Sequence, residues 1–336
     1  MTKFLVTGSA GFIGFHVSQR LLKDGNEVHG IDNLGDYYDV GLKVARNRIL
    51  EGHPGYRFQK ADLAEADAVK VIFDKTAPDL VLHFAAQAGV RHSLSHPRAY
   101  ADSNLIGFLN VLEGCRAARV KHLVYASSSS VYGLDSTLPF SVHQNTDHPV
   151  SFYAATKKAN ELMAHSYSHL FGIPTTGVRL FTVYGPWGRP DMALFSFTKS
   201  ILAGKPIEIF GDGRMRRDFT YIDDVVEGIV RLQGKAPGPN PAWDAGRADA
   251  ATSSAPYRLY NIGNRSTVEV LRLIEVLEEC LGRKAERRFV AAQACEVAAA
   301  VADVSDLERD TGYAPTTPLE AGVRQFVAWY RDHFKA

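Results

Sequence analysis

The stretch Lys3-Phe4-Leu5-Val6-Thr7-Gly8-Ser9-Ala10-Gly11-Phe12-Ile13-Gly14 decides the fold of this chain. Its first five residues form an apolar run typical of a buried strand, and a helical pattern follows from Phe15 to Lys23. Glycines between a strand and a helix allow a tight turn and bring backbone N–H groups close to a pyrophosphate at the positive end of the helix. The stretch therefore predicts the first strand, turn and helix of a dinucleotide-binding unit.

The next apolar run, residues 27–31, ends in Asp32-Asn33. An acid at the tip of the second strand can accept hydrogen bonds from the hydroxyls of an adenosine ribose. A 2′-phosphate would meet the negative charge of Asp32 there. The pattern therefore predicts NAD as the cofactor in preference to NADP.

Strand-like runs continue at residues 57–60, 80–84, 122–126 and 175–180, with helical patterns such as 105–118 between them. This alternation predicts an α/β fold, a Rossmann-type doubly wound parallel sheet. Ligands of such sheets lie beyond the carboxyl ends of the strands. Strand ends and the glycine turn supply the predicted cofactor-binding residues, which are Gly8, Gly11, Phe12, Ile13, Gly14, Asp32, Asn33, Asp62, Leu63, Ala85, Ala86 and Gln87.

A catalytic pattern follows the fifth strand, where four consecutive serines (residues 127–130) precede Tyr153 and Lys157. A tyrosine has an ordinary pKa of about 10 and is a poor base at neutral pH. A lysine four residues later lies on the same side of a helix, and its charge favours the phenolate. Such a pair can take a proton from an alcohol while a hydride leaves the same carbon, and a serine can hold that hydroxyl in line.

Composition excludes several classes of protein. The 336 residues are 46% hydrophobic with a formal net charge of +1, which leaves no electrostatic footprint for nucleic acid or an anionic membrane. We expect no signal peptide, because an apolar run typical of a strand begins at Lys3, and no apolar run approaches the length of a membrane span. Three scattered cysteines lack metal-ligand spacing, so we expect no metal site and a cytoplasmic location.

Several longer segments resemble the extended short-chain dehydrogenase/reductase superfamily. They are the TGxxGxxG turn, HFAAQAGV, SSSSVYG, YAATK, RLFTVYGPWGRPDMALF and RRDFTYIDD. The last two are similar to UDP-glucuronate 4-epimerases of the NAD-dependent epimerase/dehydratase family. The resemblance covers nearly the whole chain. It implies an isomerase with NAD as cofactor and a UDP-sugar as substrate.

The resemblance also assigns roles, and a change of pattern beyond about Thr182 predicts the domain boundaries. It implies that Ser128, Tyr153 and Lys157 are catalytic, that Lys157 also binds the nicotinamide ribose together with Tyr153, and that Arg189 and Arg217 contact the nucleotide. Residues 1–180 would form the NAD-binding Rossmann domain, with 205–232 crossing back to it. Residues 181–204 and 233–336 would form a smaller mixed α/β lobe that binds the UDP-sugar.

One loop departs from the family pattern. Gln293-Ala294-Cys295-Glu296-Val297-Ala298 stands where the family usually reads QPGDVP. Glu296 replaces the aspartate that contacts the uridine, so we expect altered nucleotide binding there but the same class of reaction.

The residues before Val131-Tyr132-Gly133 distinguish the possible reactions. Related dehydratases and decarboxylases typically carry a glutamate there, whereas this chain has Ser130, and a hydroxyl cannot remove the C5 proton. The expected cycle oxidises C4, turns the ketosugar over and returns the hydride to its other face. A 4-keto glucuronate is a β-keto acid that loses CO₂ readily, so neutral donors must hold its carboxylate. Ser129, Ser130 and Thr182 are the candidates.

Three alternatives remain open from the sequence: a UDP-glucose/UDP-galactose 4-epimerase, a UDP-glucuronate decarboxylase, and a redox-sensing NAD-binding module without catalysis. The presence of all three catalytic residues disfavours the last. The family also implies a homodimer, formed through the helices around residues 105–118 and 153–171.

Overall fold

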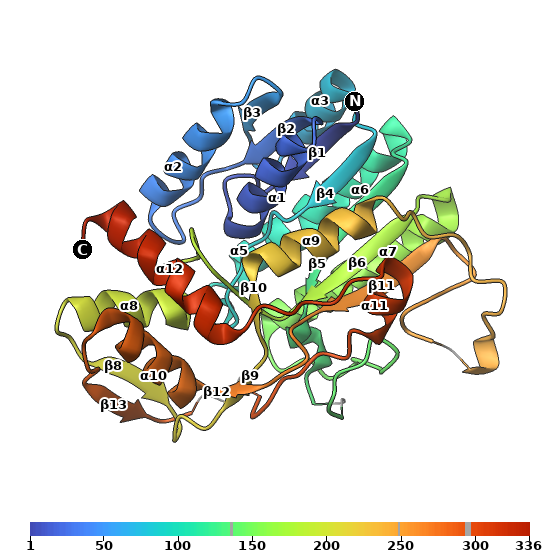
Figure 1. The fold of residues 1–336 in the computed structure, drawn as a ribbon. Coiled ribbons are helices and arrows are strands. Elements are labelled where there is room, and N and C mark those ends of the chain that lie inside the picture. Colours follow the sequence, from blue (N-terminus) through green and yellow to red (C-terminus); the bar gives the residue numbers. More distant parts are fainter. Residues whose placement is uncertain (135–136, 248, 293–296) are drawn as a thin grey trace.

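A seven-stranded parallel sheet forms the centre of the computed structural model, which describes residues 1–134, 137–247, 249–292 and 297–336 (Figure 1). The strand order is β11-β6-β5-β4-β1-β2-β3, and every neighbouring pair is parallel. The strands are β1 (Lys3–Thr7), β2 (Glu27–Asp32), β3 (Tyr56–Lys60), β4 (Leu80–His83), β5 (His122–Ser128), β6 (Thr175–Leu180) and β11 (Tyr257–Ile262). Strand order reverses between β1 and β4, which places the ligand crevice at their carboxyl ends. The predicted doubly wound fold is confirmed.

Helices cover both faces of this sheet. One face carries α1 (Phe12–Lys23), α2 (Val40–Glu51) and α9 (Ile222–Gln233), and the other carries α3 (Ala66–Thr76), α6 (Gly107–Ala118) and α7 (Phe152–Phe171). Each helix buries one apolar side, as Phe15 of α1 and Phe108 of α6 show, with no exposed surface on either side chain. Burial from both faces explains why the central strands β1 and β4 read as continuous apolar runs.

A smaller lobe packs beside the sheet. It contains α8 (Ala193–Leu202), α10 (Val270–Leu281), α12 (Leu319–Phe334), and a parallel pair of strands, β8 (Ile207–Phe210) and β13 (Arg287–Val290). Its core is continuous with the apolar layer under α1 and α9. Shorter elements connect the two parts. They are α4 (His92–Ser95), α5 (Pro97–Tyr100), a π-helical turn (Ala101–Ile106), a 3₁₀ turn (Ser129–Tyr132), β7 (Thr182–Tyr184), β9 (Arg216–Arg217), β10 (Phe219–Tyr221), a second 3₁₀ turn (Ala245–Arg247), β12 (Val268–Glu269) and α11 (Ser305–Thr311).

The chain returns to the large sheet at β11, which the sequence did not indicate. We expected residues 233–336 in the lobe, but β11 pairs with β6 at the edge of the main sheet. Conversely, within 205–232, β8 pairs with β13 of the lobe, whereas α9 packs against α1. The polar residues Arg258 and Asn261 interrupt the apolar pattern of β11, which is why this edge strand was missed. The division into a cofactor domain and a sugar lobe otherwise stays a prediction.

The excursion at residues 234–256 is exposed over its first part, as expected from its composition. Its end packs against the sheet, because Ala251, Ser253 and Ala255 are buried. Among the described residues, no helix combines the length and apolar character needed to cross a membrane.

Candidate active site

The glycine turn between β1 and α1 is tightly packed. Gly8 has a φ of +71°, a conformation that favours glycine, and its N–H donates to the carbonyl of Ile31 over 2.7 Å. A Cβ atom on Gly14 would lie 2.1 Å from the Gly8 oxygen, so the close approach of helix and turn requires glycine there. Gly11 is the N-cap of α1, and no side chain caps this helix.

These features fit the pyrophosphate of a dinucleotide. The first turn of an α-helix leaves backbone N–H groups without intrahelical partners, and an anion can accept their hydrogen bonds. The N–H groups of Phe12 and Ile13 belong to this uncapped turn of α1, beside a glycine cradle with no room for larger side chains. The structure therefore places the predicted glycine-turn residues together, in the context that the sequence indicated.

The acids expected near the adenosine lie at adjacent strand ends. Asp32 is almost fully buried at the end of β2, and one of its carboxylate oxygens accepts from the N–H of Leu34 over 2.8 Å. Asn33 donates from Nδ2 to Asp62, which follows β3, over 3.0 Å. Leu63, the next residue, is also buried. These residues lie together at the carboxyl ends of β2 and β3, and their contact with the adenosine stays a prediction.

A side chain from a π-helical turn fixes the backbone after β4. Asn104 accepts from the N–H of Gln87 through Oδ1 over 2.8 Å and donates from Nδ2 to the carbonyl of Gln87 over 3.1 Å. The same amide donates to Thr156 of α7 over 3.0 Å. Ala85 lies against the glycine turn, because a Cβ on Gly8 would fall 2.7 Å from the nitrogen of Ala85. The strand ends after β1 and β4 thus meet at the switch point.

The catalytic pattern converges where β5 meets α7. Ser151 caps α7 by accepting from the N–H of Ala154 over 3.1 Å, which places Tyr153 in the first turn. Lys157 is buried, and its Nζ donates to the carbonyl of Ala126 in β5 over 3.0 Å. Ser128 ends that strand, two residues beyond this carbonyl. The predicted serine, tyrosine and lysine therefore occupy one region.

The electrostatics of the tyrosine differ from our expectation. Burial raises the pKa of the Tyr153 phenol above its ordinary value, while the Ser128 hydroxyl and the charge of Arg189 act in the opposite direction. Burial also lowers the pKa of the Lys157 ammonium to about 8, and the carboxylate of Glu161 opposes that shift. Arg189, which we had assigned to the nucleotide, therefore also favours the phenolate.

The other predicted substrate residues lie on β7, on β9 and in the 3₁₀ turn after β5. Thr182 begins β7, and its N–H donates to the carbonyl of Asp218 over 3.1 Å. Arg217 donates to the carbonyl of Val297 over 2.8 Å. Ser129 and Ser130 form the 3₁₀ turn after β5, and the Ser128 hydroxyl donates to that of Ser130 over 3.1 Å. Glu296 lies outside the described residues.

Arg189 is held by an acid in its own loop. Its guanidinium donates to both oxygens of Asp191, and Tyr37 donates to the same carboxylate over 3.1 Å. Burial, and to a smaller extent the Asp191 carboxylate, raise the pKa of Tyr37 to about 12. The arrangement joins the loop after β2 to the loop that follows β7.

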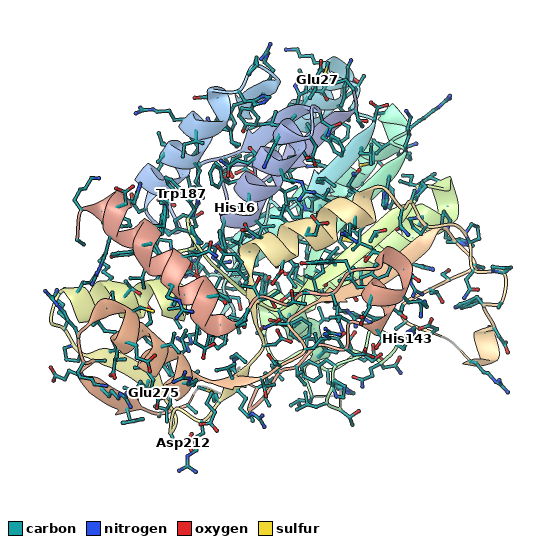
Figure 2. All side chains as sticks on the ribbon, viewed as in Figure 1. His16, Glu27, His143, Trp187, Asp212 and Glu275 are labelled. Carbon is teal, nitrogen blue, oxygen red and sulfur yellow. The ribbon has the colours of Figure 1, made fainter. Side chains whose placement is uncertain are left out.

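Several residues that position the site were not found from the sequence. Arg46 of α2 is fully buried and donates to the carbonyls of Ala10 and Trp187, which ties the glycine turn to the loop containing Arg189. His16 of α1 bonds the carbonyl of Pro186 in that loop over 2.9 Å, and the labelled His16 and Trp187 lie close together in Figure 2. These interactions join residues far apart in sequence and have no local pattern.

Comparisons with known proteins agree with this geometry. The family model described as the NAD dependent epimerase/dehydratase family matches residues 4–246. The chain is 46% identical over 334 residues to a probable UDP-glucuronate 4-epimerase of Rhizobium meliloti (strain 1021), covering 99% of this chain and 98% of that protein. It is 47% identical over 335 residues to UDP-glucuronate 4-epimerase 1 of Arabidopsis thaliana, covering 98% of this chain and 77% of that protein.

A solved structure is similar over almost the whole fold. The UDP-glucuronic acid 4-epimerase of Bacillus cereus, crystallised with UDP-glucuronic acid and NAD, superposes with a TM-score of 0.88 and 34% identity. The match covers 98% of this chain and 99% of that one.

Proposed function

Because this chain belongs to the NAD dependent epimerase/dehydratase family, we propose that it interconverts UDP-glucuronate and UDP-galacturonate. The observation that carries the proposal is the convergence of Ser128, Tyr153 and Lys157 beside a glycine turn that fits a dinucleotide. The relatives named above indicate the substrate.

Each catalytic residue has a role that follows from its chemistry. Tyr153 takes the proton of the C4 hydroxyl, and Ser128 hydrogen-bonds the same oxygen and keeps it in line. Lys157 supplies a positive charge near the phenol and binds the nicotinamide ribose. NAD supplies the hydride acceptor and donor at C4, so the net redox change is zero. The ketosugar then turns over in the site, C4 receives the hydride on its other face, and Tyr153 returns the proton to the C4 oxygen.

Retention of the sugar carboxylate is assigned to neutral donors. Loss of CO₂ from a 4-keto glucuronate requires the breaking C5–C6 bond to lie roughly perpendicular to the ketone. We propose that Ser129, Ser130 and Thr182 hold the carboxylate away from that geometry. The hydrogen bond of 3.1 Å between Ser128 and Ser130 keeps the second hydroxyl next to the catalytic serine. A hydroxyl at Ser130 also cannot act as the base for elimination at C5.

The nucleotide is assigned to arginines of the lobe side of the crevice. A guanidinium fork matches the oxygens of a diphosphate, which suits Arg189 and Arg217. In the structure these guanidinium groups bind Asp191 and the carbonyl of Val297, so we expect nucleotide binding to redirect them. Glu296 is proposed to contact the uridine.

We also propose that two copies of the chain associate through α6 and α7. Apolar side chains of these neighbouring helices are exposed, with Leu162 at 61% and Leu170 at 64% of their surface accessible. Ile106, the last residue before α6, and Leu109 of α6 continue this pattern. A second copy would cover these side chains with the same helices in a four-helix arrangement. The expected compartment is the cytoplasm, which suits the free thiols of Cys115 and Cys280.

The test incubates purified protein with UDP-glucuronate and, in a separate reaction, with UDP-glucose. Chromatography then separates the products, including any UDP-pentose. We expect UDP-galacturonate from UDP-glucuronate, and no conversion by a Tyr153→Phe variant. UDP-xylose would show that Ser130 does not prevent decarboxylation. Conversion of UDP-glucose alone would move the assignment to a neutral-sugar epimerase.

Thr182 provides a separate test of substrate selection. Galactose epimerases usually have asparagine at this place, so a Thr182→Asn variant should lose preference for UDP-glucuronate over UDP-glucose. An unchanged ratio of kcat/KM values would show that Thr182 does not read the carboxylate.

A further inference from the structure

A buried acid lies on the helix that carries the catalytic pair. Tyr153, Lys157 and Glu161 are spaced by four residues along α7, so the three side chains follow one side of the helix. Each step of four residues advances about 6 Å along the helix axis. Glu161 is 2% exposed although it carries a charge, so specific partners must compensate its burial.

Those partners belong to the strands beneath α7. Arg179 of β6, with no exposed surface, donates from Nε and Nη2 to the two carboxylate oxygens of Glu161, each over 2.9 Å. Ser127 of β5 donates its hydroxyl to the same carboxylate over 2.6 Å. Ser127 and Arg179 are register partners in the parallel pairing of β5 and β6. One carboxylate therefore joins α7 to two adjacent strands at the same level.

The contacts of Glu161 lie next to the catalytic residues on both β5 and α7. On β5, the carbonyl of Ala126 accepts from Lys157, Ser127 binds Glu161, and Ser128 follows as the catalytic serine. On α7, Glu161 comes one turn after Lys157. The contacts of Lys157 with Ala126 and of Glu161 with Ser127 thus fix the position of α7 along β5. They come immediately before Ser128, which must face Tyr153.

We propose that Glu161 is a positioning residue, which fixes α7 on β5 and β6 and thereby holds Tyr153 and Lys157 in line with Ser128. The inference rests on the proposed epimerase function. Glu161 touches neither substrate nor cofactor in this assignment, so its effect passes through Lys157 and the strand. A displacement of about 1 Å at a catalytic group can reduce a rate by about one-hundred-fold.

The charge of Glu161 adds a second effect on Lys157. Burial lowers the pKa of that ammonium to about 8, and the Glu161 carboxylate acts in the opposite direction. Removing the negative charge should therefore lower the pKa of Lys157 further. Other charged or titratable groups near this pair come from each packed element, namely Lys158 of α7, His83 of β4, Tyr125 of β5, Tyr132 of the 3₁₀ turn, Arg179 of β6 and Tyr257 of β11. They are unchanged in a Glu161 variant.

The experiment compares Glu161→Gln with the wild type by kcat, KM for UDP-glucuronate, melting temperature and the pH dependence of kcat. We expect kcat to fall about 10- to 100-fold with KM within about threefold, because the substrate contacts are intact. The alkaline limb of the pH profile should begin at a lower pH. Glu278 provides a matched control, because it is also 2% exposed and bound to Arg287 but lies in the lobe. Its Glu278→Gln variant should keep the wild-type kcat and pH profile.

A second variant distinguishes a loss of activity from a failure of the protein to fold. Glu161→Gln leaves Arg179 buried and without its carboxylate, whereas Glu161→Met combined with Arg179→Met removes both charges at once. This double variant should fold and show the same loss of kcat. A folded Glu161 variant with wild-type kcat and pH profile would overturn the inference and reduce Glu161 to a structural anchor. A wild type that converts no UDP-sugar would instead refute the proposed function.

Discussion

Replacement of Gly14 by alanine tests whether the glycine turn is built for close approach to a cofactor. The new Cβ would lie 2.1 Å from the oxygen and 2.8 Å from the carbonyl carbon of Gly8, and 3.1 Å from the Cα of Ser9. All three are backbone atoms, so no side-chain rotation can relieve the contact. Helix α1 must move away from the turn by about 1 Å, and strain of this kind costs about 1–3 kcal/mol of stability. The better helix propensity of alanine offsets at most about 1 kcal/mol.

The larger expected effect of Gly14→Ala is on NAD. Displacement of α1 misaligns the N–H groups of its first turn, and a hydrogen bond to a charged group contributes about 1.5–3 kcal/mol. Loss of one such bond corresponds to an affinity about 10- to 100-fold lower. The assay is the molar ratio of NAD released from purified protein by acid, together with melting temperature.

The matched control for Gly14→Ala is Gly238→Ala. No atom lies within 4 Å of a Cβ at Gly238, so this change should alter neither the NAD content nor the melting temperature. If Gly14→Ala retained the NAD content and melting temperature of Gly238→Ala, the steric reasoning and the assignment of the turn would both be refuted.

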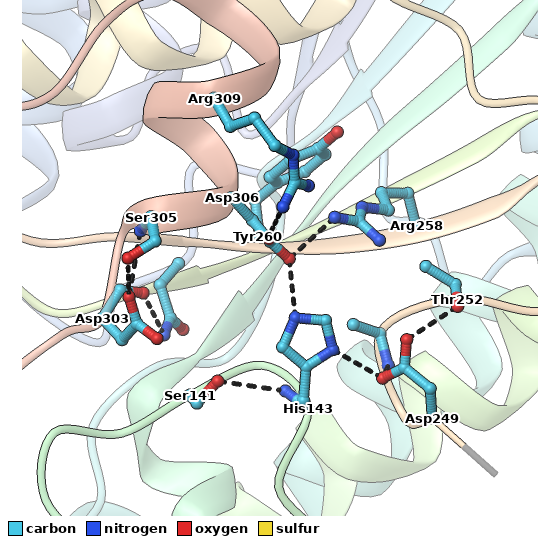
Figure 3. A network of polar contacts seen from close by, with 12 residues as sticks. Ser141, His143, Asp249, Thr252, Arg258, Tyr260, Asp303, Ser305, Asp306 and Arg309 are labelled. Atoms are coloured by element: carbon cyan, nitrogen blue, oxygen red, sulfur yellow. Dashed lines mark hydrogen bonds and ion pairs between the residues drawn. The ribbon is translucent and has the colours of Figure 1, made fainter. Parts of the chain in front are cut away.

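Three further predictions concern pH, cofactor choice and association. His143 contacts Asp249 over 2.7 Å and Asp306 over 2.9 Å, and these carboxylates raise its pKa from 6.5 to about 9 (Figure 3). The stabilising contribution of the His143 ion pairs is therefore complete below about pH 6.5 and is lost as the pH rises through about 9; it is on the order of 1 kcal/mol for this half-exposed side chain. Urea unfolding should show the free energies of unfolding of wild type and His143→Gln converging across that range. A difference that stays constant with pH would contradict this prediction. Asp32→Ser should reduce the preference for NAD over NADP by about tenfold or more, measured by reconstitution of cofactor-free protein, and an unchanged ratio would show that Asp32 does not contact the ribose. Leu162→Arg should convert a dimer to monomer in sedimentation measurements, whereas a wild type that is already monomeric would exclude association through α7.

The sequence predicted the features that depend on local patterns. The glycine spacing, the acid after β2 and the Tyr153 to Lys157 spacing each lie in short segments whose structure follows from their own residues. The parallel sheet followed from alternating strands and helices, and its strand ends collected the predicted cofactor residues at one rim.

Other features depend on contacts between distant segments. Arg46 reaches the loop after β7, and Glu161 meets Arg179 only because β5 and β6 are paired. Nothing in the neighbourhood of these residues in the sequence distinguishes them from exposed charges of a helix. Strand β11 was missed for a related reason, since Arg258 and Asn261 interrupt its apolar pattern and their partners, Asp306 and Phe140, are distant in sequence.

The effect of the folded environment on the pKa of Tyr153 also could not be predicted from the sequence. The spacing of four residues correctly placed Lys157 on the same helix, but burial of the phenol has the largest effect and raises its pKa. Arg189, from a loop 36 residues further along the chain, acts with Ser128 against that shift. Such a contribution depends on the folded arrangement of the two parts of the molecule.

The central claim is that a hydride leaves C4 of UDP-glucuronate and returns to the same carbon without exchange. The most direct test uses UDP-glucuronate deuterated at C4, purified protein in ordinary water and no added NAD, with the products followed by NMR. The account predicts UDP-galacturonate that retains deuterium at C4 and carbon at C6. Loss of the deuterium to solvent, or a pentose product that has lost C6 as CO₂, would contradict it.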